Sequence, residues 1–410
     1  MKLFYFILPL SFLTLNSCKE NKPTNPLDQL KKDVYYLAND SLEGREIGTK
    51  GEKIAADYIA KRYETIGLSS YNNSYLHQIE RKGNNPHDSS TYEKLIKGNN
   101  VIGFIDNKSK SNIIIGAHYD HLGWGEEGSL HLSENNIKAI HNGADDNASG
   151  VSALFYIANK LKDKKLNHNI YFIAFTGEEK GLWGSKYLTI NDSSLISKTD
   201  AMINMDMVGR LDSNNRLAIY GVGTSPSFIP TLEKLNEKPK FSFKYDSSGI
   251  GPSDHTSFYL ENIPVLHFFT GQHEDYHKPT DDAEKINFSG LEKVSSFITD
   301  LVLDLDKKEK IVFTKTKEKK TKSRSFNVTL GLIPDYLYDG KGMKVDGLKD
   351  DRPAKNAGLE KGDVVVKMDT ITINSMNDYM DALGVFEPEQ TIEITVIRNN
   401  KERTQQLTFD

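Results

Sequence analysis

The sequence has almost no cysteine and no excess of positive charge. Cys18 is the only cysteine among 410 residues, which excludes an intramolecular disulfide. The formal net charge is −5, whereas a nucleic-acid-binding protein would carry a basic domain. Apolar and charged fractions are ordinary for a globular protein, and the length predicts two or three domains.

The N-terminal apolar run is too short to favour a membrane span. Leu3–Leu15 follows Met1-Lys2 and ends in "LNSC", which includes Cys18. This arrangement resembles a bacterial lipoprotein signal, in which residues 1–17 are removed and the cysteine is acylated. The alternatives are an ordinary leader with a chance cysteine, or a small buried thiol. The resemblance implies a tether over 18–26 and a lipid-anchored protein of the bacterial cell envelope, on the periplasmic face or the cell surface.

Residues 27–305 alternate between apolar runs and amphipathic stretches. Strands are expected at Ile113–Ala117, Ile170–Phe175, Ala201–Met205, Leu217–Tyr220 and Pro264–Phe269. Helices are expected at Leu27–Leu37, Lys50–Thr65, Ala148–Leu161 and Phe288–Leu305. This alternation predicts an α/β fold, with a mostly parallel or mixed central sheet flanked by helices. Ligands of such sheets lie outside the carboxyl ends of the strands.

The composition changes after residue 305. The stretch 306–324, "DKKEKIVFTKTKEKKTKSR", is rich in lysine and predicts a solvated linker. Contact of its lysines with anionic lipid head groups is the alternative. Residues 325–410 show short β patterns and one helical stretch, Met376–Leu383, which predict a small separate β-rich domain.

Residues of the types that bind metals follow several expected strands and loops. They are His118 and Asp120 in "HYDH", Asp145 and Asp146 in "NGADDNASG", Glu178 and Glu179 in "TGEEKG", Asp206 in "NMDMVG", and Tyr276 and His277 in "EDYHKPTD". A single acid at a strand end is more often a helix cap, but five such groups are hard to explain as caps. Carboxylates gathered without counter-charge repel each other and take up protons. A bound divalent metal would neutralise them.

The charge balance favours two ions. Two divalent cations are matched by Asp145, Glu179 and Asp206 together with one bridging hydroxide, while the histidines serve as neutral ligands. Mixed imidazole and carboxylate ligation suits Zn²⁺ best, with Co²⁺ or Mn²⁺ possible.

In this order, the motifs "GAHYDH", "GADDNASG", "TGEEKG", "NMDMVG" and "DYHKPTD" resemble the M28 family of di-zinc aminopeptidases. The stretch "GREIGTKGEKIAADYI" resembles the family's N-terminal signature. The resemblance covers residues 27–305 and implies the zinc exopeptidase, phosphorylase/hydrolase-like fold. It implies the following ligands: His118 and Asp206 on one zinc, Glu179 and His277 on the other, and Asp145 bridging both, with a cis peptide between Asp145 and Asp146.

The resemblance also implies the catalytic roles. Glu178 is the expected general base, which acts on a metal-bridging hydroxide in the removal of N-terminal residues from peptides. Tyr276 is expected to donate a hydrogen bond to the developing oxyanion. Asp120 is expected to orient His118, and Asp146 to support the ligands without binding a metal itself. His121 is expected to have a polar loop role. The alternatives are a carboxypeptidase, a glutaminyl cyclase-like acyl transfer, which in the related family uses a single zinc, and a non-catalytic envelope scaffold.

The C-terminal domain carries its own motif. "LGLIPDY", Leu330–Tyr336, and the later "AGLEKGDVV" resemble a PDZ domain. This resemblance implies that an extended peptide or protein C-terminus adds to an exposed sheet edge, with its carboxylate received by the loop at Leu330, Gly331 and Leu332. The alternative is a docked domain that only steadies the rest of the protein.

Overall fold

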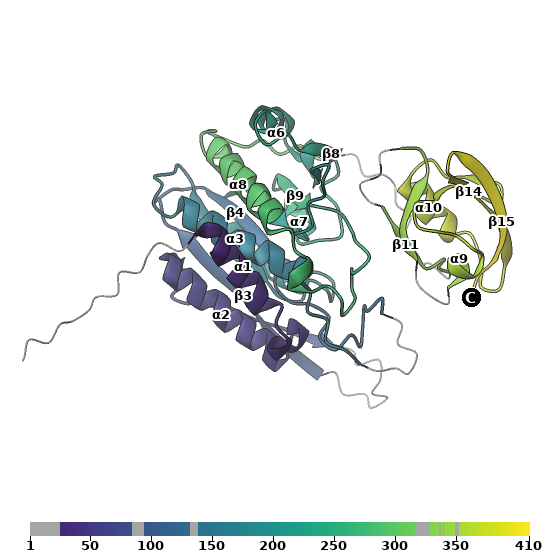
Figure 1. Ribbon diagram of the computed structural model, residues 1–410. Helices are drawn as coiled ribbons and strands as arrows, with labels where there is room; N and C mark the ends of the chain where they lie inside the picture. The colour runs from purple at the N-terminus through teal and green to yellow at the C-terminus, as the bar shows by residue number, and fades with distance from the viewer. Residues whose placement is uncertain are drawn as a thin grey trace, which may run out of the picture.

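The structure is a computed structural model of the 410-residue chain (Figure 1). It describes residues 25–83, 94–131, 138–316, 328–335, 338, 340–348 and 352–410. Cys18 and the predicted leader lie outside the described residues, so lipidation stays a prediction. Within the described ranges, no helix has the length and hydropathy needed to cross a membrane.

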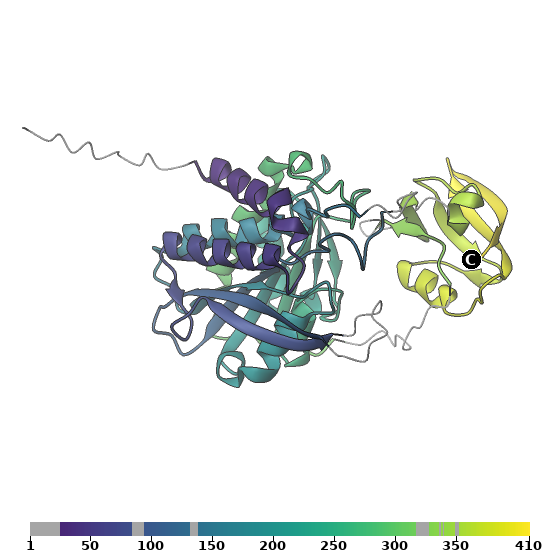
Figure 2. The same ribbon diagram turned by 90° about the horizontal axis from the view of Figure 1, so that it is seen from below.

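Two helices with well-defined caps open the N-terminal domain. α1 (Pro26–Leu37) begins after Asn25, whose side chain accepts a hydrogen bond from the backbone N–H of Leu27. α2 (Lys50–Ile66) begins after Thr49, and Gly67 ends it in the left-handed region at φ 93°. These are the residue types that helix ends favour. Figure 2 shows the two helices lying side by side at the start of the chain.

A mixed sheet forms the centre of this domain. In the described part of the chain it has nine strands in the order β1-β3-β5-β4-β6-β9-β7-β8, with β2 paired to β3. The bounds are β1 Ser69–Ser70, β2 Leu76–Gly83, β3 Lys94–Ile105, β4 Asn112–His118, β5 Asn169–Phe175, β6 Thr199–Met205, β7 Arg216–Tyr220, β8 Ser242–Asp246 and β9 Val265–Phe269. The predicted mixed α/β fold is confirmed, because β5, β4, β6 and β9 are mutually parallel, while β3 runs antiparallel to β5 and β7 runs antiparallel to β9.

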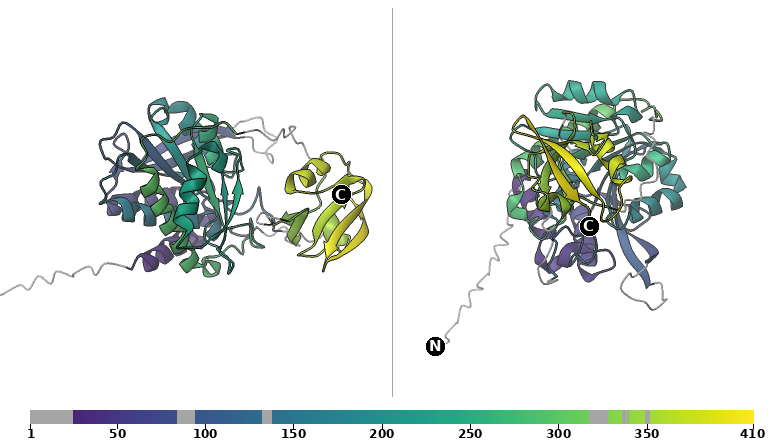
Figure 3. Two further views of the ribbon diagram at one scale, coloured as in Figure 1. Left: turned by 90° about the horizontal axis from the view of Figure 1, so that it is seen from above. Right: turned by 90° about the vertical axis from the view of Figure 1, so that its right-hand side faces the viewer.

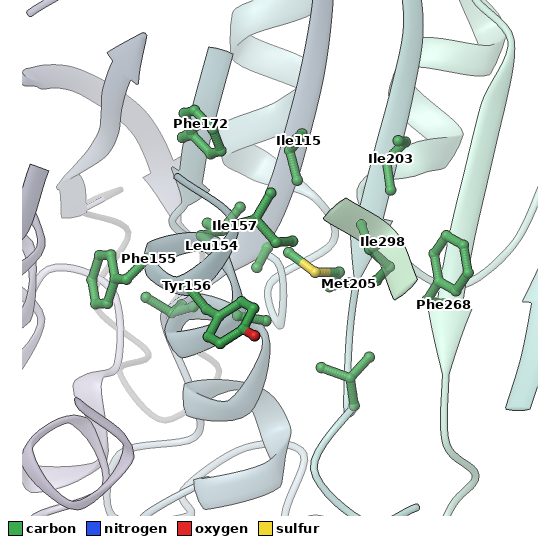
Figure 4. Close-up of a cluster of buried hydrophobic side chains, with 14 of the residues drawn as sticks. Ile115, Leu154, Phe155, Tyr156, Ile157, Phe172, Ile203, Met205, Phe268 and Ile298 are labelled. Carbon is green, nitrogen blue, oxygen red and sulfur yellow. The ribbon is translucent and has the colours of Figure 1, made fainter. Parts of the chain in front are cut away.

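Helices cover both faces of the sheet. Ile113 and Ile115 of β4 point into one hydrophobic cluster, and Ile114 points into another on the opposite face. The first face is covered by α1, α2, α3 (Gly150–Leu161), α6 (Phe228–Asn236) and α8 (Phe288–Leu305); the second is covered by α4 (Trp183–Asn191), α5 (Ser193–Ile196) and α7 (His255–Leu260). Figure 4 shows side chains of β4, β5, α3 and α8 meeting in the first cluster.

The parallel strands bring the candidate site together. β4 pairs in register with β5, so His118 lies opposite Phe175, and Gly116 of β4 lies opposite Asn204 of β6. The loops that follow these strands therefore leave the same edge of the sheet. This is the edge where ligands of α/β sheets bind.

The residues that follow α8 are not simply solvated. Ile311 is 2% exposed, the ring of Phe313 lies 5.6 Å from that of Tyr259, and the backbone N–H of Thr314 donates to the carbonyl of Thr224. The prediction of a solvated linker over 306–324 is therefore wrong for residues 311–316. The run of three apolar residues in "KIVFT" is the signal that the surrounding lysines obscured. Residues 317–327 lie outside the described ranges.

The C-terminal domain is a second body with its own core (Figure 3). Among the described residues, its sheet has the order β10-β11-β12-β14-β15, with β13 paired to β12. The bounds are β10 Leu332–Pro334, β11 Met343–Leu348, β12 Val364–Met368, β13 Ile371–Thr372, β14 Thr391–Arg398 and β15 Lys401–Thr408, with helices α9 Pro353–Asn356 and α10 Met376–Leu383. The predicted helix at Met376–Leu383 is confirmed.

Candidate metal centre

His118 ends β4 and faces two carboxylates. Its Nε2 lies 3.1 Å from Oδ1 of Asp206 and 3.3 Å from Oδ1 of Asp146. Its Nδ1 lies 3.2 Å from the backbone carbonyl oxygen of Asp120. The Asp120 carboxylate is 3.7 Å from Nδ1, and it instead accepts the backbone N–H of Glu178 at 3.1 Å and that of Glu179 at 3.4 Å. Asp120 thus orients the His118 ring through its main-chain carbonyl. Its side chain holds the loop that carries Glu178 and Glu179.

Asp146 lies at the centre of the cluster, so the prediction that it only supports the ligands is wrong. Its Oδ1 faces His118, and its Oδ2 lies 3.3 Å from Nε2 of His277. The side chain is buried, and the residue sits in the turn Ala144–Ser149 just before α3. The Asp146 carboxylate therefore offers one oxygen to the group around His118 and the other oxygen to the group around His277.

The prediction that Asp145 occupies this central position is wrong. Oδ1 of Asp145 accepts the backbone N–H of Gly209 at 2.7 Å, and its Oδ2 lies 3.2 Å from Nε2 of His273. The predicted cis peptide is also displaced by one residue, since it joins Asp146 to Asn147. The physical reason is the non-helical backbone of Asp146 and Asn147, which delays α3 to Gly150 and turns consecutive side chains to different sides.

Asp281 holds this turn in place. Its Oδ2 accepts the backbone N–H groups of Asp145 at 2.9 Å and Asp146 at 3.1 Å, and its backbone carbonyl accepts that of Ala144. It is the last residue of the motif "DYHKPTD", in which the sequence analysis assigned roles only to Tyr276 and His277. Two consecutive donors bound to one buried carboxylate set the direction in which Asp146 points.

Glu179 and His277 form the other half of the cluster. Oε2 of Glu179 lies 3.3 Å from Nε2 of His277. The other ring nitrogen of His277, Nδ1, lies 2.9 Å from the backbone carbonyl oxygen of Gly128, and this contact orients the imidazole. His121 also contacts Glu179, with Nδ1 at 2.9 Å from Oε1. His121 was expected to have only a polar loop role; its position in "HYDH" was the available signal for this contact.

These spacings suit tetrahedral zinc. Two ligand atoms bound to one Zn²⁺ lie about 3.3–3.6 Å apart, because each Zn–N or Zn–O bond is about 2.0–2.2 Å long. The pairs His118–Asp146, His277–Asp146 and His277–Glu179 all lie at 3.3 Å. The groupings His118, Asp146, Asp206 and His121, Asp146, Glu179 each bring three ligand atoms together. The donor set of this chain therefore fits zinc, with Asp146 shared between two groups.

Comparisons with known proteins identify the family of each domain. Residues 100–302 match the model of peptidase family M28, and residues 300–408 match that of the PDZ domain. The chain combines an M28 peptidase domain with a PDZ domain. The aminopeptidase YwaD of Bacillus subtilis (strain 168) is 30% identical over 190 residues, which cover 44% of this chain and 42% of the relative. The chain thus spans less than half the length of that curated relative.

Solved structures show the same fold. A zinc aminopeptidase from Bacillus subtilis aligns with a TM-score of 0.56 and 18% identity, over 71% of this chain and 98% of the other. The glutaminyl cyclase of Porphyromonas gingivalis aligns with a TM-score of 0.55 and 17% identity, over 68% and 98%. At these identities the likeness concerns the fold alone, and it is shared by enzymes of two different reactions.

The M28 domain places the two residues expected to act on substrate, both half-buried, beside the predicted metal ligands. Glu178 lines the same cavity as Glu179, Asp206 and His277. Burial raises the pKa of Glu178 well above its ordinary value; the charge of His118 opposes this, while Glu179 and Asp206 raise it further. Tyr276 lines the cavity too, with its ring stacked on that of His277 at 3.9 Å.

The histidine of the second group is strongly basic in this setting. Burial alone would lower the pKa of His277, but the Glu179 and Asp146 carboxylates outweigh it and raise the pKa to about 11. For Glu179, burial and Asp146 raise the pKa, while His277 and His121 outweigh them and lower it to about 2. Such an excess of carboxylates draws positive charge into the centre, either as protons or as metal ions.

Arg45 supports the metal loops from the side of the N-terminal motif. The buried guanidinium donates to the carbonyls of Tyr119 at 2.7 Å, Asn142 at 2.7 Å and Gly143 at 3.0 Å, and also to that of Leu37. Tyr119 lies next to His118, and Gly143 lies just before the turn that carries Asp146. Burial lowers the pKa of Arg45 to about 10, so it remains a cation at neutral pH. No role was predicted for Arg45, although its motif "GREIG" belongs to the N-terminal stretch that resembles the family.

Proposed function

We propose that this protein is a zinc-dependent aminopeptidase that removes N-terminal residues from peptides. The observation that carries the proposal is the placement of the two Asp146 oxygens, one toward His118 and Asp206 and the other toward Glu179 and His277. A shared carboxylate of this kind is suited to two ions. Co²⁺ or Mn²⁺ are also compatible with imidazole and carboxylate ligands.

The proposed ligands divide into two sets around Asp146. His118 and Asp206 would hold one ion, and Glu179 and His277 the other. Bound zinc supplies Lewis-acid chemistry, which polarises a carbonyl and lowers the pKa of water. His121 holds the Glu179 carboxylate by a hydrogen bond, a contact that orients a ligand rather than replacing it.

The chain's own residues then carry the proton transfers. Glu178 takes a proton from the attacking water and delivers it to the nitrogen of the leaving amine. Its backbone N–H is anchored by Asp120, so the carboxylate is held beside the ligands. Burial raises the pKa of Tyr276 well above its ordinary value. Its hydroxyl therefore stays protonated and can donate a hydrogen bond to the developing oxyanion.

A hydrolysis assay tests this function. The full chain, loaded with zinc, should release nitroaniline from aminoacyl-4-nitroanilides but not from N-acetylated ones. Chelation should abolish turnover, and zinc or cobalt should restore it. Glu178→Gln should lower kcat by about 100-fold to 10,000-fold with zinc content unchanged, while the exposed Glu274→Gln should behave as wild type. Full activity of Glu178→Gln would reject the assignment of the base.

The same assay separates the alternatives. A glutaminyl cyclase would release ammonia from a peptide with N-terminal glutamine and leave every peptide bond intact. A carboxypeptidase would accept N-acetylated peptides. Either outcome, without release of free N-terminal residues, would reject the aminopeptidase proposal. No turnover of any of these substrates by the zinc-loaded protein would favour the scaffold.

A further inference from the structure

One cavity joins the metal centre to the PDZ domain. It has a volume of about 1450 Å³, and Glu178 and Tyr276 lie on its inner wall. Its outer wall is formed by the turn between β10 and β11 and by the start of α10, which contribute Asp335, Tyr338 and Ser375. A peptide that leaves the metal centre along this cavity therefore meets the PDZ domain.

Polar contacts hold the two walls together. Lys244 of β8 donates to the backbone carbonyl of Tyr338 at 2.5 Å, and Nη1 of Arg216 on β7 lies 3.7 Å from Oδ2 of Asp335. Lys344 of β11 donates to the same Asp335 oxygen at 3.2 Å. Two basic side chains of the peptidase sheet thus contact Asp335 and the Tyr338 carbonyl of the PDZ domain. The contact fixes which end of β10 faces the metal centre.

The direction of β10 determines in which direction a bound peptide would run. In the described part of the PDZ sheet, β10 is the edge strand, and an exposed edge is where an extended peptide can add. Gly331 precedes it at φ 71°, in the loop Leu330–Leu332 where the carboxylate is expected. β10 then runs away from this loop and ends at Pro334, next to Asp335 at the cavity wall. A peptide whose carboxylate lies at the loop must direct its N-terminal part into the cavity.

We propose that the cavity and the β10 edge form one continuous site, which binds a free oligopeptide by both ends. The N-terminus lies at the metal centre, and the C-terminal carboxylate lies at the loop Leu330–Leu332. This inference rests on the proposed aminopeptidase function and names its substrate class: short peptides with a free C-terminus. Since β10 itself spans only about 10 Å at about 3.3 Å per residue, a peptide must exceed a threshold length to reach both ends.

The experiment compares free acids with C-terminal amides. Peptides of increasing length, with one common N-terminal residue, are given to the full-length zinc-loaded protein in both forms. For the shortest peptides, kcat/KM should be equal for the two forms. Above the threshold length, the acid should exceed the amide by about tenfold, because a carboxylate accepts stronger hydrogen bonds than an amide. Equal values at every length would overturn the proposal.

A double variant tests the contact between the domains. Arg216→Gln/Lys244→Gln should reduce the acid-to-amide ratio of long peptides to about one, because it removes the two cations that contact Asp335 and the Tyr338 carbonyl. The matched control Lys53→Gln/Lys61→Gln changes two exposed lysines of α2 and should keep the ratio. A ratio that survives in the first double variant would overturn the role of this contact. If that variant folds poorly, the comparison in the wild-type protein still decides.

Aminoacyl-nitroanilides separate the two proposals. They are too short to reach the PDZ domain, so their hydrolysis depends on the metal centre alone. Failure of the wild-type protein to hydrolyse them would count against the aminopeptidase function. Hydrolysis of nitroanilides together with equal kcat/KM for acids and amides would count only against two-ended binding.

Discussion

Adjacent aspartates allow a sharp test of the metal centre. We predict that Asp146→Asn removes one ion and most activity, whereas Asp145→Asn retains both ions. The two substitutions have the same chemistry and lie one residue apart, so each is the other's control. They differ in what the carboxylate contacts: Asp146 faces two imidazoles at 3.3 Å, and Asp145 faces Gly209 and His273.

The expected magnitudes follow from those contacts. An asparagine at 146 offers one oxygen and one NH₂ group, so only one of the two ligand groups keeps an oxygen from this residue. The loss should exceed about 100-fold in kcat/KM, since removing a ligand costs more than the roughly 10–100-fold typical of a residue that only orients ligands. An asparagine at 145 can still accept the N–H of Gly209, so its loss should stay within that smaller range.

Zinc content and turnover together make the measurement. After dialysis against a weak chelator, the metal content of each variant is determined by mass spectrometry, and kcat/KM is measured with an aminoacyl-nitroanilide. The assignment of Asp146 as the shared ligand would be wrong if Asp145→Asn lost an ion while Asp146→Asn kept two. Equal losses in both variants would also refute it, because Asp145 would then act as a ligand.

Two further predictions concern charge in the buried site. Arg45→Met should lower the free energy of unfolding by at least about 4 kcal/mol, because it leaves four buried carbonyls without this donor at about 1–3 kcal/mol each. Urea unfolding measures the loss, with Lys53→Met at an exposed position as the control. Similar unfolding midpoints for the two variants would contradict the prediction. Zinc binding at pH 7 should release at least one proton, since His277 with a pKa of about 11 is protonated in the metal-free protein and must be neutral to bind. Zinc affinity should accordingly rise with pH. Calorimetry in two buffers of different ionisation enthalpy measures the release, and identical heats would argue against it.

The site residues at the ends of strands could be predicted from the sequence, because buried parallel strands are easy to recognise and end at one edge of the sheet. β4, β5 and β6 are mostly apolar and are buried almost throughout, and parallel strands end at a common edge. Metal-binding residue types directly after such runs, as at His118 and Asp206, must therefore converge. The same reasoning placed Glu179 beside them.

The loop residues could not be assigned in this way. Asp145 and Asp146 are chemically identical neighbours, and only the backbone of the turn decides which of them points inward. That backbone depends on Asp281, which lies 135 residues further along the chain than Asp146. The β2–β3 hairpin was also missed, because polar residues such as Arg81 and Lys97 interrupt its apolar pattern, and its strands pair with each other at the margin of the sheet.

The packing of residues 311–316 shows that the peptidase domain extends to Thr316. A chain cut after Leu305 would lose Ile311 from the core, and Tyr259 would lose both its ring partner Phe313 and its hydrogen bonds with Thr316. A shortened enzyme meant to work without its PDZ domain should therefore extend to Thr316. The stretch that joins the two domains begins only after the chain has finished building the first.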